Sequence, residues 1–130
     1  MQRQIYVNIP VKDLEKTNTF FKNLGFEFNA NYSNEQATCM IVGENIFVML
    51  LQEEFFKTFI KKDLVDAKKS TEVLLCINEA SKQKVDEFVE KAIANGGTNG
   101  NTTEYDFMYS RSFDDLDGHT WEIVWMAEAN

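Results

Sequence analysis

The acidic side chain best placed to do chemistry is Glu122, which stands in an aromatic, apolar run near the end of the sequence. Trp121 and Trp125 flank it, so burial of this run would withdraw the carboxylate from water and raise its pKa. A carboxylate with a raised pKa can act as a general base near neutral pH. The alternative is a carboxylate without a catalytic role, hydrogen-bonded to Tyr6. Both interpretations stay open, because a base also needs an electrophilic partner for the developing enolate.

Four further side chains have chemistry of their own. Glu72 begins a β-prone run and is either a second functional carboxylate or an exposed residue at a strand end. His119, the single histidine, follows Gly118 in a turn pattern, which favours a place near the rim of a site over metal coordination. Cys39 and Cys76 lie in apolar runs without C-x-x-C spacing, as expected of buried, reduced thiols. No neighbouring His or Lys would activate Cys76 as a nucleophile.

Aromatic residues offer a possible binding surface. Tyr6, Phe107, Tyr109 and Phe113 could form a pocket for a flat or cationic ligand, because aromatic faces attract cations and bury large areas. Aromatic side chains in strands also form ordinary hydrophobic cores, and that alternative stays open.

Length and composition limit the classes of protein that fit. The 130 residues, 44% of them hydrophobic and 11 of them Phe, suffice for one domain or two small repeated modules. A net charge of −8 and a pI near 4.6 argue against nucleic acid as a partner and allow a cationic ligand, although solubility explains the charge equally well. No apolar run is long enough for a signal peptide or membrane helix, so we expect a cytoplasmic protein that does not bind membranes.

The first half of the chain reads as a strand, a helix and three more strands. Residues 5–9 alternate β-forming and polar side chains and run into Pro10. Asp13 is a plausible N-cap for a helix over 14–24, which Gly25 ends. Three strands are predicted after it, over 26–32, 37–42 and 46–51. An amphipathic connector helix is predicted next, over 53–67.

The second half repeats this order. A strand over 72–77 is followed by a helix that Ser81 caps and Gly96 stops, and then by three strands, over 98–103, 107–113 and 119–126. This internal repeat predicts an α+β fold of two βαβββ modules that bury their sheets together, with module one at about 1–52, the connector helix at about 53–67 and module two at about 68–130. A ferredoxin-like sandwich is the second choice, because its topology does not contain three strands after each helix.

Two motifs resemble a known superfamily. The first half contains Val7-Asn8-Ile9-Pro10-Val11-Lys12-Asp13-Leu14-Glu15-Lys16, then Phe20-Phe21 and Leu24-Gly25-Phe26. The second half ends with Asp115-Leu116-Asp117-Gly118-His119 and Trp121-Glu122-Ile123, similar to a D-P-D-G-x-x-x-E pattern. Together they resemble the two module signatures of the vicinal oxygen chelate superfamily, which includes glyoxalases, bleomycin resistance proteins and dioxygenases. The resemblance implies a half-open sheet cup formed by both modules.

The resemblance also implies where a metal would bind. Metal-dependent members place one ligand at each of four equivalent strand positions, which fall here on Tyr6, Met49, Glu72 and Glu122. Two carboxylates alone would make a weak site, because tyrosine is a poor ligand at neutral pH and the methionine thioether is soft. We therefore expect no resident metal, with a divalent metal as the alternative.

Alternation along the strands then predicts which side chains line the cup. Ile5, Val7, Ile9, Trp121, Ile123 and Trp125 would pack against the helices. Ser110 and Ser112 are added from the resemblance to fosfomycin-modifying relatives. The predicted lining is Tyr6, Asn8, Met49, Glu72, Leu74, Cys76, Ser110, Ser112, Val124 and Met126.

Three hypotheses for function follow. The first is a metal-free, small-molecule-binding protein, similar to antibiotic-sequestering members, that binds a cationic or aromatic ligand as a homodimer. The second is a metal-dependent enzyme, a glyoxalase I-like lyase or a dioxygenase- or transferase-like relative, with Glu122 as metal ligand or general base. The third is an interaction module whose cup has become filled core.

Overall fold

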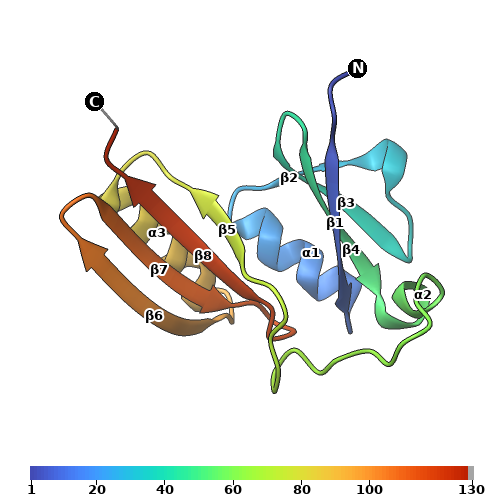
Figure 1. Cartoon of the computed structure of the whole chain (residues 1–130). Helices are drawn as coiled ribbons and strands as arrows, with labels where there is room; N and C mark the ends of the chain where they lie inside the picture. The colour runs from blue at the N-terminus through green and yellow to red at the C-terminus, as the bar shows by residue number, and fades with distance from the viewer. Residues whose placement is uncertain (129–130) are drawn as a thin grey trace. The chain divides into compact units, whose positions relative to one another are not determined.

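The computed structural model describes residues 1–128, and the chain divides into two compact units, Met1–Val65 and Asp66–Asn130. Each unit contains a four-stranded sheet with its principal helix inserted after the first strand (Figure 1). The predicted α+β fold of two repeated modules is confirmed. The ferredoxin-like alternative is wrong, because the strands form two separate sheets.

The first unit is a mixed sheet with strand order β1-β4-β3-β2. The edge strand β1 pairs in parallel with β4, while β4 with β3 and β3 with β2 are antiparallel. A parallel pair needs a long crossover, which α1, β2 and β3 provide here. The elements are β1 (Ile5–Val11), α1 (Leu14–Asn23), β2 (Glu27–Asn29), the 3-10 turn η1 (Ala30–Tyr32), β3 (Ala37–Gly43), β4 (Ile46–Gln52) and α2 (Glu53–Lys57).

The sequence determines both ends of α1. The Asp13 carboxylate accepts a hydrogen bond from the backbone N–H of Lys16 at 3.1 Å, which caps the first turn as predicted. Gly25, with φ of 103°, provides the left-handed conformation just after the helix. Between these ends, Phe20 and Phe21 are buried against the sheet and form much of the core of the first unit.

The second unit repeats this topology with strand order β5-β8-β7-β6. Ser81 caps its helix by accepting a hydrogen bond from Lys84 N–H at 3.1 Å, again as predicted. In the view of Figure 1, α3 lies behind the sheet. The elements are β5 (Leu75–Asn78), α3 (Lys82–Ala94), β6 (Thr98–Tyr105), β7 (Met108–Asp114) and β8 (Thr120–Met126).

An ion-pair network joins α3 to β7. The Arg111 guanidinium donates to Asp86 at 3.1 Å and to Glu90 at 3.0 Å, both on α3. The Tyr109 hydroxyl donates to the same Asp86 carboxylate at 2.7 Å. The hydrogen bond from Tyr109 is the largest cause that holds the pKa of Asp86 below its usual value; burial opposes it, and the hydrogen bond and charge of Arg111 add to the lowering.

The connector helix predicted over 53–67 is wrong in length, since α2 spans only Glu53–Lys57. A short helix depends on packing of its apolar face, and Phe59 and Val65 remain 68% and 53% exposed. Within residues 1–128, no helix has the length and hydropathy needed to cross a bilayer.

Three strand predictions also differ from the structure. The strand expected over 26–32 is limited to Glu27–Asn29, because the next three residues form η1. The strand expected over 72–77 begins only at Leu75, which pairs with Trp121. The strand predicted over 98–103 is longer in the structure, where it forms the eight-residue strand β6. Most of its side chains are polar, so a search for alternating apolar residues does not indicate its full length.

Candidate ligand-binding site

In each unit, one sheet face packs on the helix and the other, which we call the open face, points away from it. Side chains alternate along the strands, so the register defines both faces. The helix side buries Ile9, Trp121 and Ile123, as predicted. By register, the first open face carries Tyr6, Asn8, Cys39, Phe47, Met49 and Leu51, and the second carries Cys76, Asn78, Ser110, Ser112, Glu122, Val124 and Met126.

An aromatic pair is the most distinctive feature of the first open face. Tyr6 on β1 lies opposite Phe47 on β4, and their rings stack with centroids 4.8 Å apart and planes 15° from parallel. Tyr6 is 43% exposed, and its hydroxyl donates to the Gln4 side chain at 3.0 Å. Two residues along the strand, on the same face, Asn8 pairs with Met49. This face therefore combines an accessible aromatic surface with amide and thioether groups.

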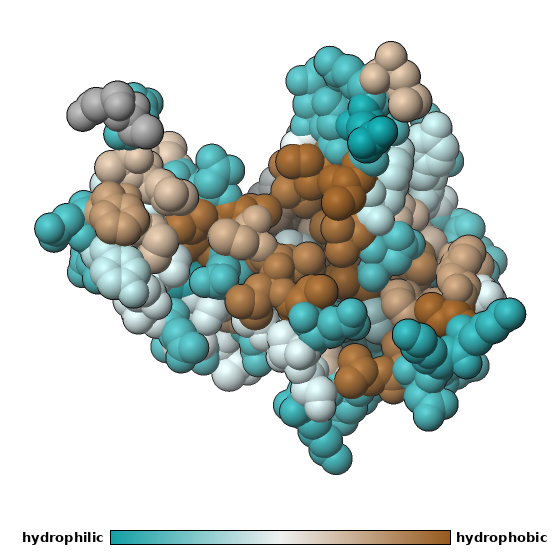
Figure 2. Space-filling view, viewed as in Figure 1, coloured by the Kyte–Doolittle hydropathy of each residue, from teal (hydrophilic) through white to brown (hydrophobic). Residues whose placement is uncertain are grey.

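The second open face has a carboxylate in the middle of a polar row. Glu122 on β8 lies between Cys76 on β5 and Ser112 on β7 in the strand register. The next row contains Asn78, Val124 and Ser110. Figure 2 shows a mixture of hydrophilic and hydrophobic residues over this sheet. The arrangement can offer a charged anchor to a ligand with a positive charge or hydrogen-bond donors.

The two cysteines differ in environment. Cys39 is buried as predicted, whereas Cys76 is exposed, because it lies on the open face of an outer strand. Partial burial of the Cys76 sulfur and, to a smaller degree, the charge of Glu122 raise the pKa of this thiol. A thiol with a raised pKa is less often the reactive thiolate. The structure thus gives Cys76 no activation as a nucleophile.

Ser112 has a structural partner on the neighbouring strand. Its Oγ accepts a hydrogen bond from the backbone N–H of Asn101 at 2.8 Å, where the pairing of β6 with β7 is irregular between Asn99 and Thr102. A Cβ on Gly100 would collide with the same oxygen. Ser112 therefore holds a β-bulge in place from the open face.

The predicted aromatic pocket of Tyr6, Phe107, Tyr109 and Phe113 is wrong, because these side chains do not share an open face. Tyr109 and Phe113 lie on the helix side, where Tyr109 bonds to α3 and Phe113 contacts Phe88 at 6.0 Å between centroids. Phe107 lies in the turn after β6 and stacks on Tyr105. Tyr109 and Ser110 are neighbours on β7, so alternation puts their side chains on opposite faces, and this was the available signal.

The predicted lining includes two residues outside the strands. Glu72 and Leu74 precede β5, so neither occupies a position on the open face of that strand. Leu74 is 55% exposed. The partner of Glu122 on the first strand of the second unit is therefore Cys76, and Glu72 lies elsewhere.

The turn between β7 and β8 contains a buried carboxylate that the sequence analysis did not select. Asp115 Oδ1 accepts hydrogen bonds from the backbone N–H groups of Asp117 and His119, and Oδ2 accepts one from Trp121 Nε1, all at 3.0 Å. Burial raises the pKa of Asp115, against the opposing effects of His119 and these donors. The Asp-x-Asp-Gly pattern is the sequence signal for such a turn. His119 lies in this turn, as predicted.

The side chains at the four expected metal positions do not form a suitable donor set. Tyr6 stacks on Phe47, Met49 offers a thioether, and Glu72 lies outside β5, which leaves the Glu122 carboxylate. Within either unit, the described residues contain no group of three His, Cys, Asp or Glu side chains that could hold an ion. We derive no chemistry through a metal from this set.

Comparisons with known proteins show what the chain is similar to. Residues 3–43 match the family of bleomycin resistance protein-like N-terminal regions. The chain has the glyoxalase/bleomycin resistance fold, and the resemblance to the vicinal oxygen chelate superfamily indicated by the two motifs is confirmed. No curated protein is significantly similar in sequence.

Solved structures match over nearly the whole chain. A hypothetical protein from S. aureus is 28% identical with a TM-score of 0.81, and the match covers 95% of this chain and 94% of that one. A glyoxalase/bleomycin resistance protein/dioxygenase family enzyme from Burkholderia phytofirmans is 19% identical with a TM-score of 0.77, covering 95% and 98%. The fosfomycin resistance protein FosX from Listeria monocytogenes is 20% identical with a TM-score of 0.69, covering 99% and 95%. At these last two identities, the likeness describes the fold and leaves the activity open.

Proposed function

We propose that this protein binds a small organic ligand, flat and positively charged, without a resident metal ion. The observation that carries the proposal is the accessible Tyr6–Phe47 stack on the first open face, where metal-dependent relatives would have a metal ligand. The interaction of a cation with an aromatic face contributes about 0.5–2 kcal/mol to the binding free energy, and the larger values apply when the pair is desolvated. The net charge of −8 favours the approach of cations.

The test is a fluorescence titration with 9-aminoacridine, a flat organic cation, in the presence of EDTA. Binding should persist in EDTA, and Tyr6→Leu should weaken it by up to about tenfold, the equivalent of ~1.4 kcal/mol. Tyr32→Leu is the matched control, because Tyr32 is a more exposed tyrosine on η1, in the same unit. Equal affinity of the wild-type protein, the Tyr6 variant and the Tyr32 variant would refute the aromatic site.

Metal content tests the second part of the proposal. We expect purified, untagged protein to contain far less than one equivalent of Zn, Ni, Mn or Fe per chain by mass spectrometry. One equivalent of any of these metals would instead support the second candidate, a metal-dependent lyase or a dioxygenase- or transferase-like enzyme.

That second candidate is favoured by the position of Glu122, a half-buried carboxylate in the middle of the second open face. In it, Glu122 would be a metal ligand or a general base. Glu122→Gln keeps the shape and removes the charge, so unchanged turnover of any substrate that is found would exclude a catalytic role for this residue.

We further propose a cytoplasmic homodimer. The superfamily resemblance supports the dimer, and the two free cysteines suit a reducing compartment. Light scattering after size-exclusion chromatography tests the oligomeric state, and a mass of one 15.0 kDa chain would refute the dimer.

A further inference from the structure

Asp115 is unusual in being a buried carboxylate, 5% exposed, in a turn. A buried charge is costly unless its oxygens are fully hydrogen-bonded. All three hydrogen bonds described above converge on this one side chain, and they come from both the turn and the following strand. Such an arrangement fixes the turn and the strand relative to each other.

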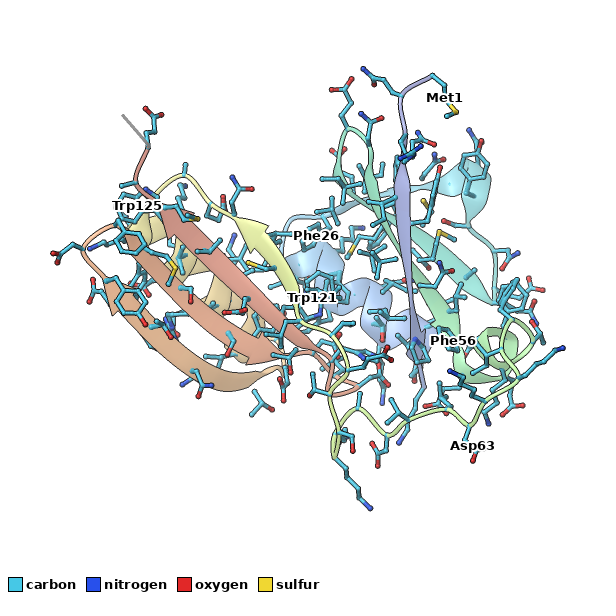
Figure 3. The ribbon with its side chains drawn as sticks, in the orientation of Figure 1. Met1, Phe26, Phe56, Asp63, Trp121 and Trp125 are labelled. Carbon is cyan, nitrogen blue, oxygen red and sulfur yellow. The ribbon has the colours of Figure 1, made fainter. Side chains whose placement is uncertain are left out.

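The strand contact is to the Trp121 indole, which is held on its other sides as well. Trp121 is 1% exposed and stacks parallel to Phe113 on β7, with centroids 6.5 Å apart and planes at 5°. Figure 3 labels Trp121 and Trp125 on β8. Burial and the contact with Phe113 restrict the indole, and Asp115 accepts the hydrogen bond from its Nε1–H group.

The backbone of the turn also leaves little freedom. Asp115 N–H donates to His119 O at 2.9 Å, and Gly118 adopts a φ of 91°. A Cβ on Gly118 would lie 2.9 Å from the backbone N and Cα of Lys68, so the segment before β5 packs directly on the turn. The start of β8 is thus fixed from several directions.

Glu122 is the next residue after Trp121, and its side chain points to the opposite face of the sheet. A strand whose indole is fixed on one face has a fixed Cα–Cβ direction at the following residue on the other. We propose that Asp115 is a positioning residue, which sets the direction of the Glu122 carboxylate on the second open face through Trp121. The inference rests on the proposed role of Glu122 as a functional carboxylate.

The alternative is that Asp115 stabilises the turn without influencing Glu122. Cys76 distinguishes the two, because it lies opposite Glu122 on β5 and its thiol pKa responds to the Glu122 charge. Alkylation by iodoacetamide over a series of pH values, read by mass spectrometry, reports that pKa. Cys39 is fully buried and should stay unmodified in the folded protein.

Asp115→Asn keeps the shape of the side chain but replaces one of its two acceptor oxygens by an NH₂ group. Both oxygens accept hydrogen bonds in the wild type, one of them from Trp121, so the substitution disturbs this set. If the amide turns Glu122 away, the pKa of Cys76 falls and its alkylation at pH 8 accelerates, by about twofold for each ~0.3 unit of pKa. Glu122→Gln should change the rate in the same direction. Val89→Ala, a destabilising change in the buried face of α3, should leave the rate at the wild-type value.

The pH titration of the Glu122 carboxyl carbon by NMR, in Asp115→Asn and wild-type protein, is the second measurement. The proposal would be overturned by a folded Asp115→Asn protein in which the alkylation rate of Cys76 and the NMR titration of Glu122 both match the wild type. Trp121→Phe, which removes the indole donor and also reduces the ring volume, replaces the Asn variant if that variant does not fold, and the same criteria apply. Neither measurement uses a ligand, so a failure of the proposed binding function would be seen separately.

Discussion

Arg111 provides the sharpest test of what holds the second unit together. Its side chain is 13% exposed, and its guanidinium bonds to Asp86, Glu90 and, at 3.2 Å, Asn99. The two carboxylates are 48% and 61% exposed, so each ion pair is worth about 0.2–1 kcal/mol, and the amide hydrogen bond adds about 0.5–1.5 kcal/mol. Arg111→Met, which keeps most of the apolar stem, should therefore lower the free energy of unfolding by about 1–3 kcal/mol.

Urea unfolding followed by circular dichroism measures this loss at pH 7 and again at about pH 3. The pKa of Asp86 is lowered in the folded state, first by Tyr109 and then by Arg111, so its stabilisation is present above the unfolded value of about 3.9 and is lost as the pH falls through the folded pKa. The effect of Arg111→Met should accordingly shrink at low pH.

Lys84→Met is the matched control for Arg111. Lys84 is 60% exposed in its ion pair with Glu87 on the same helix, and its loss should cost less than about 0.5 kcal/mol. An Arg111→Met protein as stable as the wild type at pH 7, or one equally destabilised at both pH values, would refute the electrostatic account of this network.

Three further predictions test local structure by the same unfolding measurement. Gly100→Ala should destabilise the protein because the new methyl group meets Ser112 Oγ, and Ser112→Ala should partly relieve that loss; simple additivity of the two would contradict the contact. Ser81→Ala should cost about 0.5–2 kcal/mol through loss of the α3 cap, while Ser81→Asp should restore most of it. Phe21→Ala should cost about 3–5 kcal/mol, since Phe21 is fully buried, and a loss below ~1 kcal/mol would show that the first unit repacks freely.

The sequence predicted those parts of the fold that rest on local chemistry. Asp13 and Ser81 cap their helices, and Gly25 and Gly96 adopt the positive φ expected after them. The connector helix failed because helical spacing reports a possible apolar face, whereas a helix also needs a surface to bury it. The prediction that Glu72 begins a strand and lines the cup is wrong for a related reason. The start of β5 depends on where its partner strand β8 begins.

The candidate site was predictable only in part. Alternation correctly assigned Glu122, Cys76, Val124 and Met126 to one face, because their strand period is fixed by the backbone. The stack of Tyr6 on Phe47 depends on the register of β1 against β4, which no local pattern contains. The burial of Asp115 likewise depends on an indole six residues away, brought back by the turn.

The outer strands of the two sheets share a property that matters at high protein concentration. On β1, Pro10 lacks a backbone donor; β2 and β5 comprise only three and four residues; and β6 is irregular between Asn99 and Thr102. Short, interrupted or donor-poor margins are poor templates for adding strands from another chain. Straightening β6 by removing its extra residue would thus create a regular edge and favour fibrillar aggregation over the native state.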